Sequence, residues 1–134
     1  MRYEFLEHTA DIKFRAYGAT LAEAFENAVL AFSNYVSRGK KISARKKKMA
    51  KVFGTDEKNL FYNFIDELVY LVDAEGFLAV SARVKFRGNE IDVEFKGDDT
   101  NNYDFLDHVK SATYAEMEVK KIADGWVLQA VLDV

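Results

Sequence analysis

The chain has 134 residues, of which 49% are hydrophobic and 31% charged, and its formal net charge is −3. This size and composition exclude a disordered protein and predict one globular, soluble domain over residues 1–134. The absence of cysteine excludes disulfides, thiolate metal sites and cysteine catalysis, and it fits a reducing compartment. The N-terminus lacks the apolar segment of a signal peptide, and no apolar run approaches the roughly 20 residues that span a bilayer, so we expect a cytoplasmic protein.

The N-terminal quarter predicts two strands followed by a helix. Aromatic and branched residues favour strands at 2–7 and 12–18. Thr20 and Glu23 form a capping box, in which both side chains accept hydrogen bonds from free N–H groups at a helix start. Apolar residues then recur at helical spacing, which predicts a helix at 20–37.

A basic segment separates this helix from a second one at 56–75, whose apolar residues also follow the helical period. Seven of the 19 basic residues lie in this segment: Lys40, Lys41, Arg45, Lys46, Lys47, Lys48 and Lys51. We expect an extended edge strand here, where lysine discourages aggregation between sheets. The same cluster could neutralise RNA phosphates, although the segment has no aromatic residue for base stacking before Phe53.

The second half predicts two hairpins separated by a loop. We expect strands at 77–87, 90–96, 112–122 and 126–134, with turns at Gly88-Asn89 and Asp124-Gly125. The polar segment 97–104 predicts an exposed loop and matches no complete EF-hand, and a short stretch at 105–109 follows it. This order of elements predicts an α+β domain, in which two amphipathic helices pack against a mainly antiparallel or mixed β-sheet.

Carboxylates near the two ends of the chain are the clearest candidates for chemistry. The sequence has no G-x-S-x-G elbow, P-loop or G-x-G-x-x-G motif, and two histidines without cysteine do not make a common zinc site. Asp11 precedes one apolar run and Asp133 ends another, so the two could meet and hold a hard cation such as Ca²⁺ or Mg²⁺. The alternative is that Asp11 caps a turn and that Asp133 lies in a frayed end.

Three other polar residues have ordinary interpretations. His8 and His108 stand near acidic residues, and both are predicted to be exposed or hydrogen-bonded histidines. Lys110 leads into a predicted strand, where a lysine is usually solvated. It could instead bind a phosphate or the carboxylate of a partner.

Several segments together resemble the archease family, in order and spacing, over the whole chain. They are His8-Thr9-Ala10-Asp11-Ile12, the helix Thr20–Ala28, Asp66-Glu67-Leu68, Val109–Tyr114, Gly125-Trp126 and Leu132-Asp133-Val134. The resemblance implies a small accessory protein, not an enzyme, of tRNA splicing and RNA repair. Such proteins stimulate an RtcB-type RNA ligase by promoting its guanylylation with GTP and its multiple turnover.

The resemblance also implies a site. A divalent cation, often calcium, would be held by the side chains of Asp11 and Asp133 and by the main-chain oxygen of Val134. Lys110 would be the basic residue beside this site that ligase activation requires. The family often has a histidine after the Thr-Tyr pair, where this chain has Ala115.

The sequence leaves two alternatives open. The basic stretch 40–51 is not part of the family pattern, and it could make the protein an RNA-binding module or chaperone, with tRNA contacted directly. A metal-dependent hydrolase is the other alternative, for which the sequence offers no evident general base beyond the two carboxylates.

Overall fold

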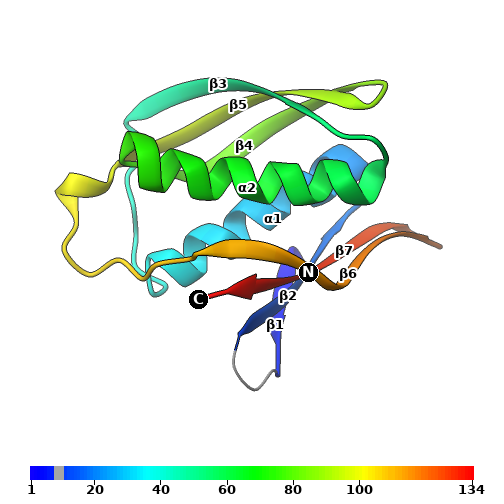
Figure 1. Ribbon diagram of the computed structural model, residues 1–134, viewed down its shortest axis with the longest axis horizontal. Coiled ribbons are helices and arrows are strands. Elements are labelled where there is room, and N and C mark those ends of the chain that lie inside the picture. The colour runs from blue at the N-terminus through cyan, green and yellow to red at the C-terminus, as the bar shows by residue number, and fades with distance from the viewer. Residues whose placement is uncertain (8–10) are drawn as a thin grey trace.

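The computed structural model describes residues 1–7 and 11–134, which form two α-helices and seven strands (Figure 1). The elements are β1 (Tyr3–Leu6), β2 (Ile12–Gly18), α1 (Leu21–Val36), β3 (Lys46–Phe53), α2 (Glu57–Glu75), β4 (Phe77–Arg87), β5 (Glu90–Asp99), β6 (Ser111–Ile122) and β7 (Gly125–Asp133). The predicted α+β class is confirmed, and both predicted helices are present within one residue of their expected bounds.

The strands divide into two antiparallel sheets, and the two helices lie between them (Figure 1). One sheet has the order β1-β2-β7-β6 and the other the order β3-β5-β4. Helix α1 contacts β2 and β4, and α2 contacts β6 and β4, so each helix packs against both sheets. The sequence predicted helices against a sheet, and the structure adds that each helix is covered on two sides. In the described part of the chain, neither helix has a segment apolar enough to cross a bilayer.

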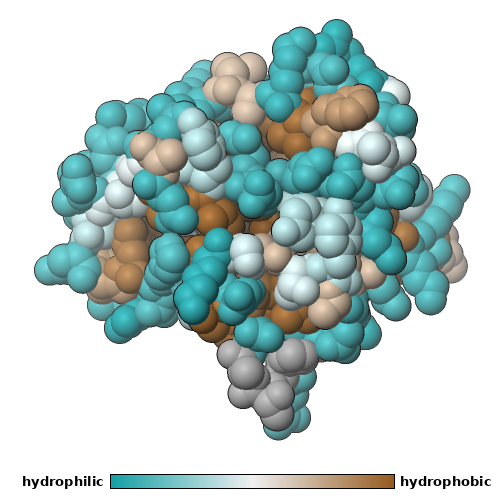
Figure 2. All heavy atoms as spheres, in the orientation of Figure 1, coloured by the Kyte–Doolittle hydropathy of each residue, from teal (hydrophilic) through white to brown (hydrophobic). Residues whose placement is uncertain are grey.

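Phenylalanine rings join the helix layer to the second sheet. Phe25 of α1 is fully buried and meets Phe61 and Phe64 of α2 and Phe86 of β4, with ring centroids 5.1–5.4 Å apart. Edge and tilted ring contacts of this kind add to the large apolar area that each ring buries. On the face that α2 crosses, the surface is mostly hydrophilic, and hydrophobic atoms are exposed in separate areas between polar side chains (Figure 2).

Both helices begin and end at residues whose side chains or backbones suit those positions. The hydroxyl of Thr20 accepts a hydrogen bond from the N–H of Glu23, and the Glu23 carboxylate accepts one from the N–H of Ala19. Asp56 is the N-cap of α2 and accepts a hydrogen bond from the N–H of Asn59. Gly76 ends α2 in the left-handed conformation that glycine adopts without steric cost.

Edge strand β3 and the two hairpins follow the sequence predictions with small shifts. Strand β3 is the edge of its sheet, as the lysine-rich segment predicts. Gly88 and Asn89 form the β4–β5 turn, because Arg87 pairs with Glu90. In the last hairpin, Ile122 pairs with Gly125, so the turn lies one residue earlier than predicted.

The loop predicted at 97–104 is wrong in its first part. Strand β5 continues to Asp99, and Gly97 pairs with both Lys46 and Ala79. The side chain of Asp98 is 1% exposed, although a run of glycine and aspartate usually marks a solvated loop. A short 3-10 turn follows at Thr100–Asn102, and the stretch 105–109 has no regular secondary structure.

Candidate functional site

The β2–β7 ladder brings the two candidate carboxylates to one end of a sheet. Its last pair joins Ile12 to Leu132. Asp11 precedes Ile12 and Asp133 follows Leu132, so the two aspartates occupy facing positions just beyond that pair. The ladder ends at that pair, so its register brings the two aspartates to the same end of the sheet without pairing them. The pairing of the strands thus places together two residues that are far apart in the sequence.

Lys110 joins the same sheet end through its backbone. Its N–H donates a hydrogen bond to the main-chain oxygen of Asp133 over 2.8 Å, and the next residue, Ser111, pairs with Asp133. The side chains of Lys110 and Asp133 are both exposed. Because the Asp133 oxygen already accepts this bond, Val134 supplies the next main-chain oxygen at this end of β7. The backbones of Asp11, Lys110 and Asp133 therefore meet at one end of the sheet, whereas His8 lies outside the described residues.

The oxygen donors at this sheet end are of the kind that a hard cation prefers, but they are too few to complete its ligand set. Carboxylate and carbonyl oxygens are the ligands that Ca²⁺ and Mg²⁺ prefer, and Ca²⁺ takes about 6–8 of them. Within residues 1–7 and 11–134, no group of three or more acidic or histidine side chains is arranged to hold a metal. The residues present fit an open site, in which water or a partner's oxygens supply the remaining ligands.

An open cleft of about 520 Å³ lies beside Asp11, between the β1–β2 end and the C-terminal end of α1. Asp11, Phe5, Tyr35, Arg38 and Asp107 are among its lining residues. Arg38 donates to Asp107 over 2.9 and 3.1 Å, which fixes one wall. Burial, and then the Asp107 charge, raise the pKa of Tyr35, so its hydroxyl in this wall is neutral at neutral pH. Asp11 is accordingly reachable from solvent through a cleft with a polar rim and an apolar wall.

An ion pair that the sequence did not predict lies next to this site. Lys13 lies two residues after Asp11, on the same side of β2, and its ammonium is 3.0 Å from the Glu116 carboxylate. The side-chain amide of Gln129 donates to the main-chain oxygen of Glu116 and accepts from Arg15, over 2.7 and 2.8 Å. These contacts hold the irregular part of β6 between Thr113 and Glu118. Strand alternation alone would have placed Lys13 beside Asp11, but no local pattern identifies its partner.

The other histidine and the departure from the family pattern lie on the surface. His108 is exposed, and its Nε2 is 3.1 Å from the Asp73 carboxylate, as predicted for an ordinary hydrogen-bonded histidine. Ala115 is exposed in the irregular part of β6, where its N–H donates to the Thr113 hydroxyl over 3.0 Å. A histidine at that position would add a polar side chain to an exposed surface of the sheet edge.

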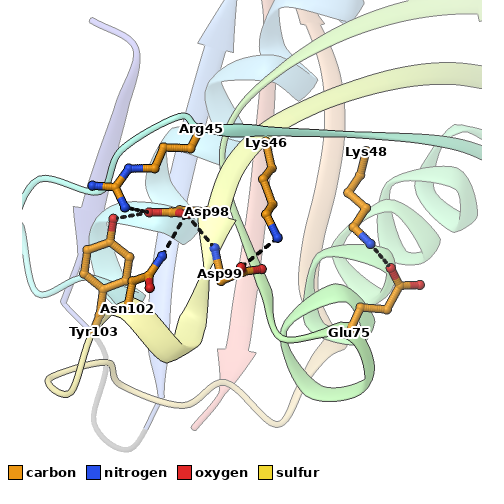
Figure 3. Close-up of polar contacts among 8 residues, drawn as sticks. All are labelled: Arg45, Lys46, Lys48, Glu75, Asp98, Asp99, Asn102 and Tyr103. Carbon is orange, nitrogen blue, oxygen red and sulfur yellow. Dashed lines mark hydrogen bonds and ion pairs between the residues drawn. The ribbon is translucent and has the colours of Figure 1, made fainter.

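The basic segment is largely paired within the protein. Four of its seven cations contact acidic side chains: Arg45 with Asp98, Lys46 with Asp99, Lys48 with Glu75, and Lys51 with Glu90 and Asp92 (Figure 3 shows the first three). The Lys40 ammonium lies 4.4 Å from the centre of the Phe105 ring. In the described part of the chain, Lys41 and Lys47 alone among the seven have no such partner. This pairing argues against stretch 40–51 as an RNA site by itself.

The Arg45 pair belongs to a group of contacts around the buried carboxylate of Asp98. Its carboxylate accepts hydrogen bonds from the Tyr103 hydroxyl at 2.6 Å, the Asn102 amide at 3.1 Å and the Asp99 N–H at 2.9 Å, and Arg45 lies 3.6 Å away (Figure 3). The Tyr103 hydrogen bond is the largest cause that lowers the Asp98 pKa. The buried carboxylate thereby ties the end of β5 to the segment before β3.

We expect Asp98→Asn to destabilise the fold at neutral pH and to flatten its acid dependence. A lowered pKa in the folded state means that the carboxylate contributes stability above its ordinary pKa of 3.8 and loses it as the pH falls through the lower folded value. Thermal unfolding from neutral pH to about pH 2 measures this, with Asp66→Asn on the exposed face of α2 as the control. A difference from wild type that persists at the acid end would contradict it.

Comparison with known proteins identifies the family. Residues 3–134 match the model of the Archease protein family. The archease of Methanosarcina acetivorans is 36% identical over 140 residues, covering 99% of this chain and 96% of that protein. The archease of Pyrococcus abyssi is 34% identical and covers 99% of each chain.

Two solved structures share the fold. The solution structure of a Methanobacterium thermoautotrophicum protein has a TM-score of 0.76 at 24% identity and covers 98% of both chains. The crystal structure of a Thermotoga maritima archease, described as a possible chaperone, has a TM-score of 0.68 at 21% identity. It covers 100% of this chain and 98% of its own. Because the family model and the curated relatives both extend over nearly all of its length, this chain belongs to the archease family.

Proposed function

We propose that this protein activates an RtcB-type RNA ligase in tRNA splicing and RNA repair, as an accessory protein and not as an enzyme. It promotes the GTP-dependent guanylylation of the ligase and its multiple turnover. Membership of the archease family supports the proposal. The observation that carries it is the convergence of Asp11, Lys110 and Asp133 at one end of the β2–β7 ladder.

The proposed site would supply only part of the ligands of a cation and leave the rest to a partner. The side chains of Asp11 and Asp133 and the main-chain oxygen of Val134 would hold a divalent cation, with calcium as the first candidate. When bound, the cation supplies positive charge that oxygens of the ligase or its nucleotide can share. Two carboxylates and one carbonyl fill only part of its ligand set, so binding strengthens when a partner provides the rest.

Lys110 would add a second, mobile positive charge. Its side chain is exposed, while its backbone is fixed to Asp133, so the base of the side chain is held and the ammonium can reach outward. A lysine ammonium suits phosphate or carboxylate oxygens as a compact charge. If this sheet end contacts the ligase more favourably in its guanylylation-competent state, binding shifts the ligase toward that state.

Single-turnover labelling of an RtcB-type ligase with radioactive GTP tests the proposal. Wild type is expected to accelerate labelling, and Asp11→Asn, Asp133→Asn and Lys110→Ala are each expected to lose most of that acceleration. Asparagine keeps the size of the side chain and removes only its charge. Matched controls are Asp66→Asn and Lys121→Ala, both exposed and without an ion pair in the described part of the chain.

Circular dichroism must show that each variant is folded. A folded Asp11→Asn/Asp133→Asn double variant that stimulates the ligase as well as wild type would refute the proposed site. No acceleration by wild type itself would refute the proposed function.

A further inference from the structure

The outer face of the β3-β5-β4 sheet carries more cations than anions. Side chains alternate along each strand, and the inward set, which includes Val84, Val93 and Phe95, is buried against the helices. The outer face consists of Lys47, Met49, Lys51 and Phe53 from β3, Glu90, Asp92, Glu94 and Lys96 from β5, and Arg83, Lys85 and Arg87 from β4. This face is therefore positive on a chain whose net charge is −3.

Most of the positive charge on the outer face has no ion-pair partner among residues 1–7 and 11–134. Lys51 and Arg87 are within 2.9–3.7 Å of Glu90 and Asp92. In the part of the chain that the structure describes, the other outer-face cations form no ion pair. These are Lys47, Arg83, Lys85 and Lys96. Glu94 is the remaining acid on the outer face. The uncompensated charge is thus four cations against one anion.

Lys47 and Lys96 are direct partners across the β3–β5 ladder. Like charges at facing positions on one side of a sheet destabilise it. On the other side of Lys96, the β4 partner is Ser81, so no acid interrupts this row. Local conflicts of this kind are typical of functional sites, and an external anion between the two ammonium groups would relieve this one.

Exposed hydrophobic side chains alternate with the lysines along β3. Met49 is 72% exposed and Phe53 is 63% exposed, and both project from the outer face together with Lys47 and Lys51. The cations alone would be enough to bind an acidic protein surface, so the exposed hydrophobic side chains would have no role there. Exposed aromatic groups beside cations on an open sheet are what unpaired RNA bases use for stacking while phosphates contact lysine.

From these observations we infer that the outer face binds single-stranded RNA. Lys47, Lys96 and Arg83 contact phosphates, and Phe53 stacks on a base. The outer face lies across the helix layer from the β2–β7 ladder that carries Asp11 and Asp133 (Figure 1). RNA binding here is therefore independent of the proposed ligase site, and the two can be tested separately.

The test is fluorescence anisotropy with a labelled oligouridine of about 15 nucleotides, across a range of salt concentrations. We expect Lys47→Glu/Lys96→Glu to weaken binding by about tenfold or more. Its slope of log affinity against log salt should fall by about 1.4, or roughly 0.7 for each lost phosphate contact. Phe53→Ala should weaken binding about fivefold or more, because it removes a stacking surface.

The control is Lys120→Glu/Lys121→Glu, which changes the net charge equally on β6 of the other sheet. It should bind like wild type. An equal loss in this control would overturn the inference, because net charge alone would then explain binding. The Lys47→Gln/Lys96→Gln variant neutralises the charges without reversing them. It takes the place of the glutamate variant if charge reversal prevents that variant from folding.

Two further results would also overturn the inference. One is wild type that fails to bind the oligonucleotide at low salt. The other is a combined result, in which polyglutamate displaces the labelled oligonucleotide as well as unlabelled RNA does and Phe53→Ala has no effect on binding. It would mark the outer face as a surface for acidic proteins.

Discussion

Alanine in place of Gly97 is expected to lower the free energy of unfolding by at least about 3 kcal/mol. A Cβ atom at this position would lie 1.9 Å from the main-chain oxygen of Leu78 and 2.9 Å from the Phe77 ring. The oxygen belongs to the backbone of β4, so it cannot rotate away as the end of a side chain can. Strands β4 and β5 must separate, next to the irregularity between Ala79 and Ser81.

Gly88→Asn provides the matched control for this prediction. Gly88 has a φ of +64° in the β4–β5 turn, and a Cβ there would have no atom within 4 Å. Asparagine tolerates the left-handed conformation, so its expected cost is about 1 kcal/mol or less. Urea denaturation of both variants measures the difference. Equal stability of the two would show that β4 does not approach Gly97 as closely as the structure has it.

The same glycine explains why the sequence misplaced the end of β5. Gly97, Asp98 and Asp99 are all depleted in strands, and locally they indicate a loop. Glycine stands here because another backbone approaches closely, and Asp98 is buried because Tyr103 and Arg45 meet its carboxylate. Tyr103 is only five residues away, but Leu78 and Arg45 come from distant segments, so a window of sequence around Asp98 lacks part of the information.

The elements themselves were predictable because their signals are local. Capping residues at Thr20 and Asp56 and the helical recurrence of apolar residues mark both helices without reference to the rest of the chain. The division into two sheets depends on which strands meet, and the pairs β2–β7 and β3–β5 join segments far apart in sequence. A helix that packs between two sheets still shows a periodic recurrence of apolar residues. This recurrence alone does not reveal that a second sheet covers the helix.

The candidate site was predictable to a similar extent. Asp11 and Asp133 stand out as carboxylates at the ends of apolar runs, and the family resemblance selects the same pair. Their facing positions depend on the β2–β7 register, which the structure supplies. The Lys13–Glu116 pair depends on an irregularity in β6 that no motif marks.

Calcium is expected to stabilise the wild-type protein in the absence of any ligase. A cation that binds only the folded state adds RT ln(1 + [L]/Kd) to the free energy of unfolding, or about 4 kcal/mol when its concentration is a thousand times the dissociation constant. The two aspartates face each other only in the folded chain, so the unfolded chain has no comparable site. Thermal unfolding with increasing calcium, and again after a chelator, measures the gain.

Asp11→Asn and Asp133→Asn should each remove most of this gain, while Asp66→Asn should keep it. Without a cation, the two facing carboxylates repel each other, so the asparagine variants should be as stable as wild type or slightly more stable in the chelator. This crossing of stabilities, in which wild type gains with calcium and the variants do not, separates a metal site from a merely structural role. If calcium stabilises none of these proteins and the carboxylates are still needed for ligase stimulation, they contact the ligase directly. The cation would then have no part in the mechanism.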